Sequence, residues 1–184
     1  MREIVVRARE GDHDAFSELA TRSIGRLTAA ARLILGDEYG AQDAVQETLI
    51  EAWQSLPGLR DPDRFDAWLR RLLVRACFSR IRRRKGRGAI EIQLTPAHEP
   101  IQTGGERALA IHDQLERGLA RIPAEQRAVL VLVYYFDLPL ADAARAMRIP
   151  LGTAKSRLSR ATRSLRAALD AEERAIAPAV GGLT

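Results

Sequence analysis

The stretch LADAARAMRIPLGTAKSRLSRATRSLRAAL, residues 140–169, predicts two helices joined by a tight turn. Arg148, Ile149 and Pro150 separate a short helix over 139–147 from a longer one over 151–169. An ideal helix turns by about 100° per residue. One side of the longer helix then carries the apolar residues Ala154, Leu158, Ala161, Leu165 and Ala168. We expect that side to be buried, so the two helices fit a helix-turn-helix.

The opposite side of the longer helix is polar and basic. It carries Ser156, Ser159, Arg160 and Arg163, with Lys155 and Arg166 flanking them. From Ala143 to Leu169 there are seven basic residues and no acidic one. In a helix-turn-helix the second helix enters the major groove, where Lys, Arg and Ser can bond to base edges and further cations contact phosphates. The pattern predicts a DNA-binding surface; the alternative is a solvated basic face on an ordinary three-helix domain.

The composition of the whole chain agrees with a folded, helical, basic protein. Hydrophobic residues make up 46% of the 184 residues, which excludes global disorder. Aromatic residues are only 5%, while Ala, Leu and Arg are abundant, and this balance favours helices. The formal net charge is +5 and the sequence pI is about 10.1, which fits a polyanionic partner.

Several classes of protein are disfavoured by what the sequence lacks. Cys77 is the single cysteine, so an intramolecular disulfide is excluded, and no Cys/His cluster has zinc spacing. No apolar run approaches the roughly 18–20 residues that cross a bilayer. The first residues lack the apolar core of a signal peptide. We therefore expect a soluble cytoplasmic protein with no cofactor and no membrane insertion.

A segment rich in Gly, Pro and Thr divides the chain. It reads KGRGAIEIQLTPAHEPIQTGG, residues 85–105, and has no helical period. Such a composition is typical of a flexible linker, and a loop of this length inside one compact domain would be unusual. We expect a domain over 1–84, a linker over 85–105, a second domain over 106–170 and a tail over 171–184, whose last residues APAVGGLT (177–184) are expected to be disordered.

Three helices are predicted before the linker, over 13–35, 42–56 and 63–84, the last with Asp63 as N-cap. Their apolar residues recur at helical spacing and predict one buried stripe per helix. The stripes consist of Phe16, Leu19, Leu27, Ala30, Ala31 and Ile34; of Val45, Leu49, Ala52, Trp53 and Leu56; and of Phe65, Trp68, Leu69, Leu72, Leu73 and Ala76.

After the linker we expect helices over 106–120 and from Pro123 to Phe136, followed by the helix-turn-helix. Residues 129–136 are β-branched and aromatic, and their propensity alone would favour a strand. The chain offers no partner strand, so we predict a helix that is buried on nearly all sides. The fold class is therefore all-α, with two small helical domains.

A second basic stripe lies on the predicted helix 63–84. Arg64, Arg71, Arg75, Phe78 and Arg82 project within about 60° of one another on an ideal helix. From Arg60 to Arg87 there are eleven basic and three acidic residues, a balance of 11 − 3 = +8. Arginines that track phosphates around an aromatic ring suit single-stranded or distorted DNA. The alternative is that Phe78 packs against a neighbour and the arginines are solvated.

The outward side of the predicted helix 42–56 is acidic with one apolar residue in its middle. It carries Asp43, Gln46, Glu47, Ile50 and Glu51. Acidic residues repel DNA, so this side is more consistent with a protein partner.

Two segments in this order resemble regions two and four of bacterial sigma factors. DAVQETLIEAW (43–53) with FDAWLRRLLVRACFSRIRRR (65–84) is similar to region two. IPAEQRAVLVLVYYFDLPLADAARAMRIPLGTAKSRLSRATRSLR (122–166) is similar to region four. With only these two regions and a short linker, the chain resembles the extracytoplasmic-function group of the sigma-70 family. The resemblance covers residues 11–84 and 110–169.

The resemblance implies a role for each surface. The minus-thirty-five promoter element would be read as duplex by Thr153, Lys155, Ser156, Ser159, Arg160 and Arg163. The minus-ten element would be recognised and opened by Arg60, Asp61, Arg64, Arg71, Arg75, Phe78, Ser79 and Arg82, with one base flipped into the loop before the third helix. The clamp helices of core RNA polymerase would be bound by Asp43, Gln46, Glu47, Ile50 and Glu51.

The family also implies partners beyond DNA. These are the beta-prime clamp helices and the beta flap of RNA polymerase, and an anti-sigma factor that would hold the protein inactive. The linker would thread the polymerase between the two domains.

Four features depart from the usual family pattern. The third helix has Arg75 and Ser79 where Asn is usual, so the minus-ten preference is expected to differ. Arg148 stands where the turn often has Gly, and a left-handed non-Gly residue costs roughly 1 kcal/mol. Ala143 and Ala154 replace larger apolar residues, and Pro139 stands where a Ser or Thr cap is common.

Two other functions compete with a sigma factor. A helix-turn-helix regulator that does not replace sigma would not need residues 43–84. An enzyme would need a catalytic constellation, and His13, His98 and His112 have no nucleophile, base or metal ligand at suitable spacing. Cys77 lies beside a predicted core stripe and is expected to pack there rather than to sense redox state.

Overall fold

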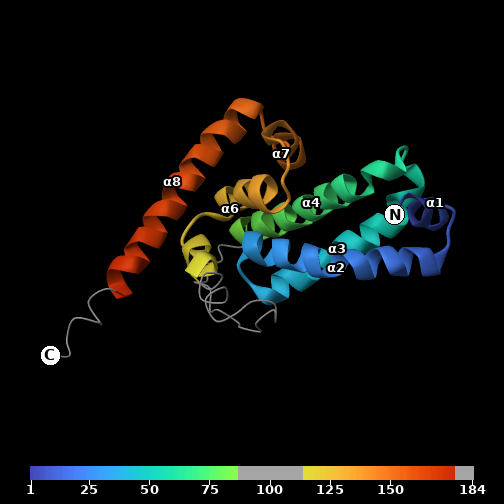
Figure 1. The fold of residues 1–184 in the computed structure, drawn as a ribbon, viewed down its shortest axis with the longest axis horizontal. Coiled ribbons are helices and arrows are strands. Elements are labelled where there is room, and N and C mark those ends of the chain that lie inside the picture. Colours follow the sequence, from blue (N-terminus) through green and yellow to red (C-terminus); the bar gives the residue numbers. More distant parts are fainter. Residues whose placement is uncertain (87–113, 177–184) are drawn as a thin grey trace. The chain divides into compact units, whose positions relative to one another are not determined.

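The computed structural model describes residues 1–86 and 114–176, and the chain divides into two compact units, Met1–Ile90 and Glu91–Thr184. Every regular element of the described residues is a helix (Figure 1). The predicted all-α class with two helical domains is confirmed. The predicted linker falls outside the described residues except for Lys85 and Gly86, which belong to the last helix of the first unit. Residues 106–113 and 177–184 also lie outside the described part.

The first unit contains four α-helices and two short 3-10 turns. In chain order these are α1 (Arg2–Arg9), α2 (His13–Leu35), α3 (Glu38–Ser55), η1 (Leu56–Gly58), η2 (Pro62–Arg64) and α4 (Phe65–Gly86). Helices α2, α3 and α4 pack against one another, and α1 lies against α2 and both 3-10 turns. Helix α1 was not predicted.

Local capping explains where α2 and α3 begin and end. Asp12 accepts a hydrogen bond from the amide of Ala15 at 3.0 Å and caps α2. Gly36 ends that helix in the left-handed conformation, with φ of 73°, which glycine adopts without steric cost. Asp37 then caps α3 by accepting from the amide of Gly40 at 2.5 Å. The predicted helix 13–35 is confirmed, whereas α3 starts four residues before the predicted 42 because Asp37 supplies the cap.

The start of α4 corrects a second boundary. Asp63 was predicted as the N-cap of α4. Instead, Asp63 belongs to the one-turn helix η2, which directly precedes α4, and Asp61 is the N-cap of η2. The carboxylate of Asp61 accepts from the amide of Asp63 at 3.0 Å. The α-helix itself begins at Phe65 and continues to Gly86.

The predicted core stripes of the first unit are largely buried. Four predicted core residues are only half-buried, namely Phe16, Leu49, Trp53 and Trp68. The first three line an open groove between α2 and α3, so their side chains are covered on one side only. The Trp68 ring lies 5.9 Å from the Phe65 ring, centroid to centroid.

The second unit begins with a helix over residues 114–120, followed by α6 (Ala124–Leu130), a π-helical turn η3 (Val131–Tyr135), α7 (Leu140–Met147) and α8 (Leu151–Ile176). Helix α8 packs against both α6 and α7. The helix 114–120 also lies close to α8, because a Cβ added at Gly118 would be 2.9 Å from Cδ2 of Leu169. Helix α8 continues to Ile176, so the predicted tail from 171 starts too early.

The prediction of a helix rather than a strand over 123–136 is confirmed. The amide of Phe136 bonds to the carbonyl of Val131 at 3.0 Å, which closes the wider π turn. The expectation of burial on nearly all sides is wrong for the last turn, where Tyr134 is 67% exposed and Tyr135 is also at the surface. Helices α6 and α7 contact η3, and the exposure of these two tyrosines shows that its last turn has an open side.

The turn between α7 and α8 has the predicted strain. Arg148 adopts the left-handed conformation, with φ of 54° and ψ of 46°, and ends α7. The next amide, of Ile149, bonds back to the carbonyl of Ala144 at 3.1 Å, and this pattern satisfies the end of the helix. Helices α7 and α8 with this turn form the predicted helix-turn-helix.

Candidate nucleic-acid interface

The two sides of α8 differ as the sequence predicts. Ala154, Ala161 and Ala168 are buried, and Leu158 and Leu165 are half-buried. The predicted contact residues Lys155, Ser156, Ser159, Arg160 and Arg163 are all exposed, while Thr153 is half-buried. Because small alanines face the core, the helix lies close to its neighbours and presents its long cationic side chains outward.

The first three turns of α8 contain local side-chain hydrogen bonds. The Ser156 hydroxyl donates to the carbonyl of Thr153 at 3.0 Å, and Nε of Arg160 donates to the carbonyl of Ser156 at 3.3 Å. Leu151 at the helix start is 53% exposed. At Gly152 an added Cβ would have no neighbour within 4 Å, so the protein itself does not require a glycine there.

The loop before α4 is anchored by every third residue. Leu56, Leu59, Pro62 and Phe65 are buried, a spacing that matches the three residues per turn of a 3-10 helix. Arg60 and Arg64 are exposed between these anchors. Asp61 is half-buried, and its carboxylate pairs with Nε of Arg64 at 3.2 Å. The loop therefore presents two arginines from a fixed backbone.

The predicted basic stripe on α4 is only partly solvent-facing. Arg71 and Arg82 are exposed, as Arg64 is, but Arg75, Phe78 and Ser79 are half-buried. Nη2 of Arg75 lies 3.0 Å from Oε1 of Glu51 on α3, and its Nε is buried without a hydrogen-bond partner. The stripe's central cation thus points toward the acidic helix.

The acidic side of α3 has the predicted members at the surface. Asp43, Gln46 and Ile50 are exposed, and Glu47 and Glu51 are half-buried. Together with Gln54 and Arg80 they line a shallow hollow of about 460 Å³. The structure therefore brings the five predicted residues to one surface and adds a cation from α4.

A row of ion pairs between α3 and α4 was not anticipated by the sequence. Its pairs are Asp37–Arg84 at 2.5 Å, Asp43–Arg80 at 3.0 Å, Glu47–Arg83 at 3.7 Å, Glu47–Arg80 at 3.9 Å and Glu51–Arg75 at 3.0 Å. The acidic residues 43, 47 and 51 are spaced by one helical turn. From Asp37 through Asp43 to Glu51 the partners run backwards along α4, from Arg84 through Arg80 to Arg75, and Glu47 contacts both Arg80 and Arg83. That reversed matching was the available signal, but it identifies partners only if the two helices are known to be antiparallel neighbours.

Comparisons with known proteins decide the family. The model of sigma-70 region 2 matches residues 19–87, and that of sigma-70 region 4 matches residues 112–165. SigM of Mycobacterium tuberculosis (strain H37Rv), an ECF RNA polymerase sigma factor, is 33% identical over 151 residues, which span 82% of this chain and 75% of the relative. This chain belongs to the extracytoplasmic-function (ECF) sigma factors of the sigma-70 family.

Solved structures agree with the assignment of this chain to the ECF sigma factors. RpoE of Bartonella quintana, in complex with the anti-sigma factor NepR, matches with a TM-score of 0.68 and 26% identity over 84% of this chain and 96% of that chain. CnrH, in complex with the cytosolic domain of CnrY, matches with a TM-score of 0.61 and 27% identity over 92% of this chain and 97% of that chain. A regulator with only a helix-turn-helix is not favoured, because the region 2 match covers residues 19–87.

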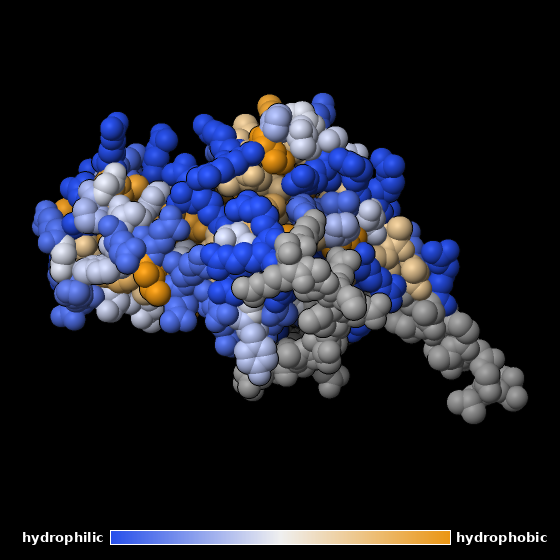
Figure 2. All heavy atoms as spheres, turned by 180° about the vertical axis from the view of Figure 1, so that it is seen from behind, coloured by the Kyte–Doolittle hydropathy of each residue, from blue (hydrophilic) through white to orange (hydrophobic). Residues whose placement is uncertain are grey.

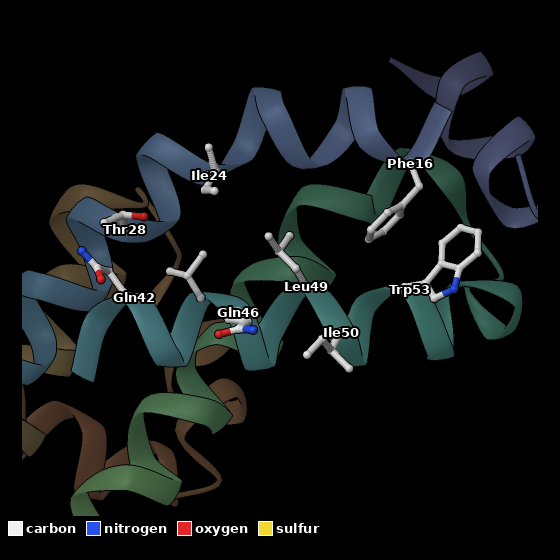
Figure 3. A pocket seen from close by; sticks show the side chains of 9 residues that line it. Phe16, Ile24, Thr28, Gln42, Gln46, Leu49, Ile50 and Trp53 are labelled. Atoms are coloured by element: carbon white, nitrogen blue, oxygen red, sulfur yellow. The ribbon is translucent and has the colours of Figure 1, made fainter. Parts of the chain in front are cut away.

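An apolar groove runs between α2 and α3 beside the acidic surface of the sigma factor. It encloses about 470 Å³ and is lined by Phe16, Ile24, Thr28, Gln42, Val45, Gln46, Leu49, Ile50 and Trp53. Figure 3 shows Phe16 and Trp53 facing each other at one end, and Thr28 and Gln42 at the other. On the side of the molecule drawn in Figure 2, hydrophilic residues predominate and hydrophobic ones form small separate patches. The groove is a functional candidate that a wheel of each single helix did not reveal, because it needs both helices.

Three further features of the described residues bear on function, namely metal-binding groups, apolar helices and reactive side chains. In residues 1–86 and 114–176, no group of three His, Cys, Asp or Glu could hold a metal, and no helix is long and apolar enough to cross a membrane. His13 begins α2, with its ring 4.5 Å from that of Trp53, while His98 and His112 lie outside the described residues. Burial raises the pKa of the Cys77 thiol to about 12, which makes this side chain unreactive at neutral pH.

Proposed function

We propose that this ECF sigma factor binds core RNA polymerase, directs it to promoters and opens the DNA for transcription initiation. The observation that carries the proposal is the presence of both sigma regions in one chain, each on its own helical unit with charged residues exposed. The protein acts in the cytoplasm as a dissociable subunit and performs no catalysis of its own.

Helix α8 reads the minus-thirty-five element in the major groove of duplex DNA. Its exposed residues Lys155, Ser156, Ser159, Arg160 and Arg163, with Thr153 in the first turn, supply the contacts. Lys155 and Arg160 reach base edges, since recognition helices use their first turns for base contacts. A bidentate contact of Arg to guanine is the commonest specific pairing, which favours Arg160 as a reader.

The loop and α4 recognise and open the minus-ten element. Arg60, Asp61 and Arg64 lie in or next to the fixed loop, and the remaining contacts come from Arg71, Arg75, Phe78, Ser79 and Arg82 on α4. Flipping one base out of the duplex costs a few kcal/mol. Arginine contacts to phosphates and stacking on Phe78 offset that cost.

The acidic surface of α3 docks on the clamp helices of the polymerase beta-prime subunit. Asp43, Glu47 and Glu51 form its charged part, and Gln46 and exposed Ile50 its centre. The adjacent α2–α3 groove extends this surface with apolar area, and burial of such area is the main favourable term in protein association. The beta flap of the polymerase contacts the region 4 unit.

An anti-sigma factor is a further partner of this protein. Both solved relatives described above are complexes, RpoE with the anti-sigma factor NepR and CnrH with the cytosolic domain of CnrY. An inhibitor that covers the α3 surface or the groove would keep the sigma factor from the polymerase.

Run-off transcription tests the proposal directly. Purified core polymerase, the full chain and a library of genomic promoters are combined, and transcripts are sequenced. We expect discrete start sites that depend on the added chain. Absence of core binding, or of any chain-dependent transcript, would refute the sigma function.

A charge reversal at Glu47 tests the polymerase surface. Glu47→Arg should weaken binding to core polymerase, measured by fluorescence anisotropy, while the full chain keeps its affinity for a minus-thirty-five duplex. Glu18→Arg is the matched control, because Glu18 is an exposed carboxylate on α2 that pairs with Arg22. Equal losses of core binding in both variants would show that general charge, not this surface, matters.

A further inference from the structure

Helix α1 is attached to the loop before α4 as well as to α2. Two of its eight residues are fully covered, with Val5 0% and Ala8 2% exposed. The helix lies against both 3-10 turns, η1 and η2 (Figure 1). A helix this short is marginal in isolation. Its order therefore depends on what it packs against.

Two arginines at opposite ends of α1 bond to the loop. Arg2 pairs through Nη1 with Oδ2 of Asp63 in η2. Nη1 of Arg9 donates to the carbonyl of Leu59 at 3.4 Å. Arg9 lies seven positions after Arg2, which is roughly 10 Å along a helix axis. The contacted residues, Leu59 and Asp63, lie on either side of Arg60 and Asp61 in the sequence.

Helix α1 is itself fixed to the start of α2. Nη2 of Arg7 lies 2.5 Å from Oδ2 of Asp12, and Nε of Arg7 donates to the same oxygen at 2.9 Å. Asp12 is also the N-cap of α2 through Ala15. A chain of contacts thus runs from α2 through α1 to the loop.

The loop's own hydrogen bonds are all short-range. The Leu59 amide bonds to the Leu56 carbonyl at 2.9 Å, the Asp63 amide to the Asp61 carboxylate at 3.0 Å and the Arg64 amide to the Asp61 carbonyl at 3.1 Å, while the Asp61 carboxylate also pairs with Arg64. One-turn 3-10 helices have poorer hydrogen-bond geometry than α-helices. A site that must receive a flipped base binds more tightly when it is held in the receiving shape beforehand.

We propose that α1 is a positioning element for the minus-ten loop, with Arg2 and Arg9 as positioning residues that hold the segment 59–63 in the shape that captures the flipped base. This inference rests on the proposed sigma function. Neither arginine touches the base. Each acts through the loop backbone or through Asp63, so its loss lowers the fraction of loops competent for capture.

Loss of these contacts should weaken capture of the minus-ten base without weakening the other interactions of the protein. An apparent affinity falls in proportion to the competent fraction, so a loop that is competent one time in about ten captures the base about tenfold more weakly. Binding to core polymerase and to the minus-thirty-five duplex does not involve this loop and stays unchanged. A general loss of structure in the first unit would instead weaken core binding as well.

The experiment uses holoenzyme reconstituted from core polymerase and the full chain. The probe is a DNA fork with a duplex minus-thirty-five region and a single-stranded non-template minus-ten strand, taken from a promoter found by run-off transcription. Arg9→Ala should lower fork affinity, and Arg9→Lys should restore part of it, because an ammonium can also donate to the Leu59 carbonyl. Arg22→Ala is the matched control, since Arg22 is an exposed arginine on α2 whose partner is Glu18.

The exposed pair Arg2–Asp63 provides a second test that does not disturb the core. Arg2→Asp and Asp63→Arg should each weaken fork binding, and the double variant with swapped charges should regain it. Unchanged fork affinity in the Arg9 and Arg2 variants, or equal losses of fork and core binding, would overturn the proposal. If wild-type holoenzyme fails to bind the fork, the sigma function fails instead, so the two failures are distinguishable.

Discussion

Nη2 of Arg75 on α4 lies 3.0 Å from Oε1 of Glu51 on α3, so a residue of the proposed minus-ten surface is bound to a residue of the proposed polymerase surface. Both side chains are about 40% exposed, at 39% and 42%. Pairs of this kind contribute roughly 0–1 kcal/mol to stability. The pair is therefore easy to break, and either partner could be recruited by a ligand.

Removal of the Glu51 charge should release Arg75 for DNA. For Glu51→Gln we expect tighter binding of the full chain to single-stranded DNA at low salt. One additional phosphate contact should steepen the slope of log affinity against log salt by about 0.7. Anisotropy of a labelled strand, measured over a salt series, gives this slope. Glu18→Gln, at an exposed α2 carboxylate, is the control, and equal slopes for both variants would show that Arg75 does not reach the strand.

Alanine substitutions on α8 should distinguish side chains that contact bases from those that contact phosphates. Ala at Lys155 or Arg160 should cost about 1–3 kcal/mol if the side chain reads a base, and should relax sequence preference at one position. Ala at exposed Arg166, further along the helix, should weaken all duplexes alike and lower the salt slope by about 0.9. Competition with duplexes changed at each minus-thirty-five position measures both effects. Uniform losses for all three variants would argue against base reading.

The substitution Gly152→Ala should raise the stability of the protein and lower its affinity for duplex DNA. The added Cβ of Gly152→Ala meets nothing within 4 Å, so the folded protein accommodates it. Alanine is favoured over glycine in helices by up to about 1 kcal/mol, and we expect a higher melting temperature. If DNA approaches the first turn of α8 closely, the same methyl group lowers duplex affinity. Higher stability with unchanged affinity would exclude such an approach.

Elements with strong local signals were predictable from the sequence. Helix α2 has a capping Asp12 and a terminal Gly36, and the sequence predicted its bounds as 13–35. The left-handed conformation of Arg148 was anticipated from the family resemblance, because Gly often stands at this place in the turn. Helix α1 has no side-chain N-cap, and only Val5 and Ala8 of its eight residues are buried. Neither a capping residue nor a long apolar stripe therefore marks this helix in the sequence.

Contacts between helices were not predictable in the same way. A helical wheel relates residues to the axis of their own helix, and it assigned the charges of α3 and α4 to two separate surfaces. The pairing of Arg80 with Asp43 and Glu47 depends on how the two helices pack. The half-burial of Trp53 has the same origin, since the open α2–α3 groove belongs to neither helix alone.

Cys77 should make stability fall at high pH. Burial raises the pKa of its thiol from the ordinary 9.0 to about 12. In the unfolded chain the thiol ionises first, so between these two pKa values the unfolded state binds fewer protons and is favoured as the pH rises. Below pH 9 the thiol contributes no slope. By pH 11 the loss should reach about 2–3 kcal/mol relative to Cys77→Ala, because the alanine variant shares every other titrating group.

Urea unfolding of both proteins at several pH values between 8 and 11 measures this difference. The folded thiol should also resist iodoacetamide at pH 8 and react once the chain is unfolded in urea, because only the thiolate is nucleophilic. The Ala substitution lowers stability at every pH by removing a buried side chain, so the change in the difference with pH is the informative quantity. Parallel stability profiles, or alkylation of the folded protein at pH 8, would mean that the thiol is accessible to solvent.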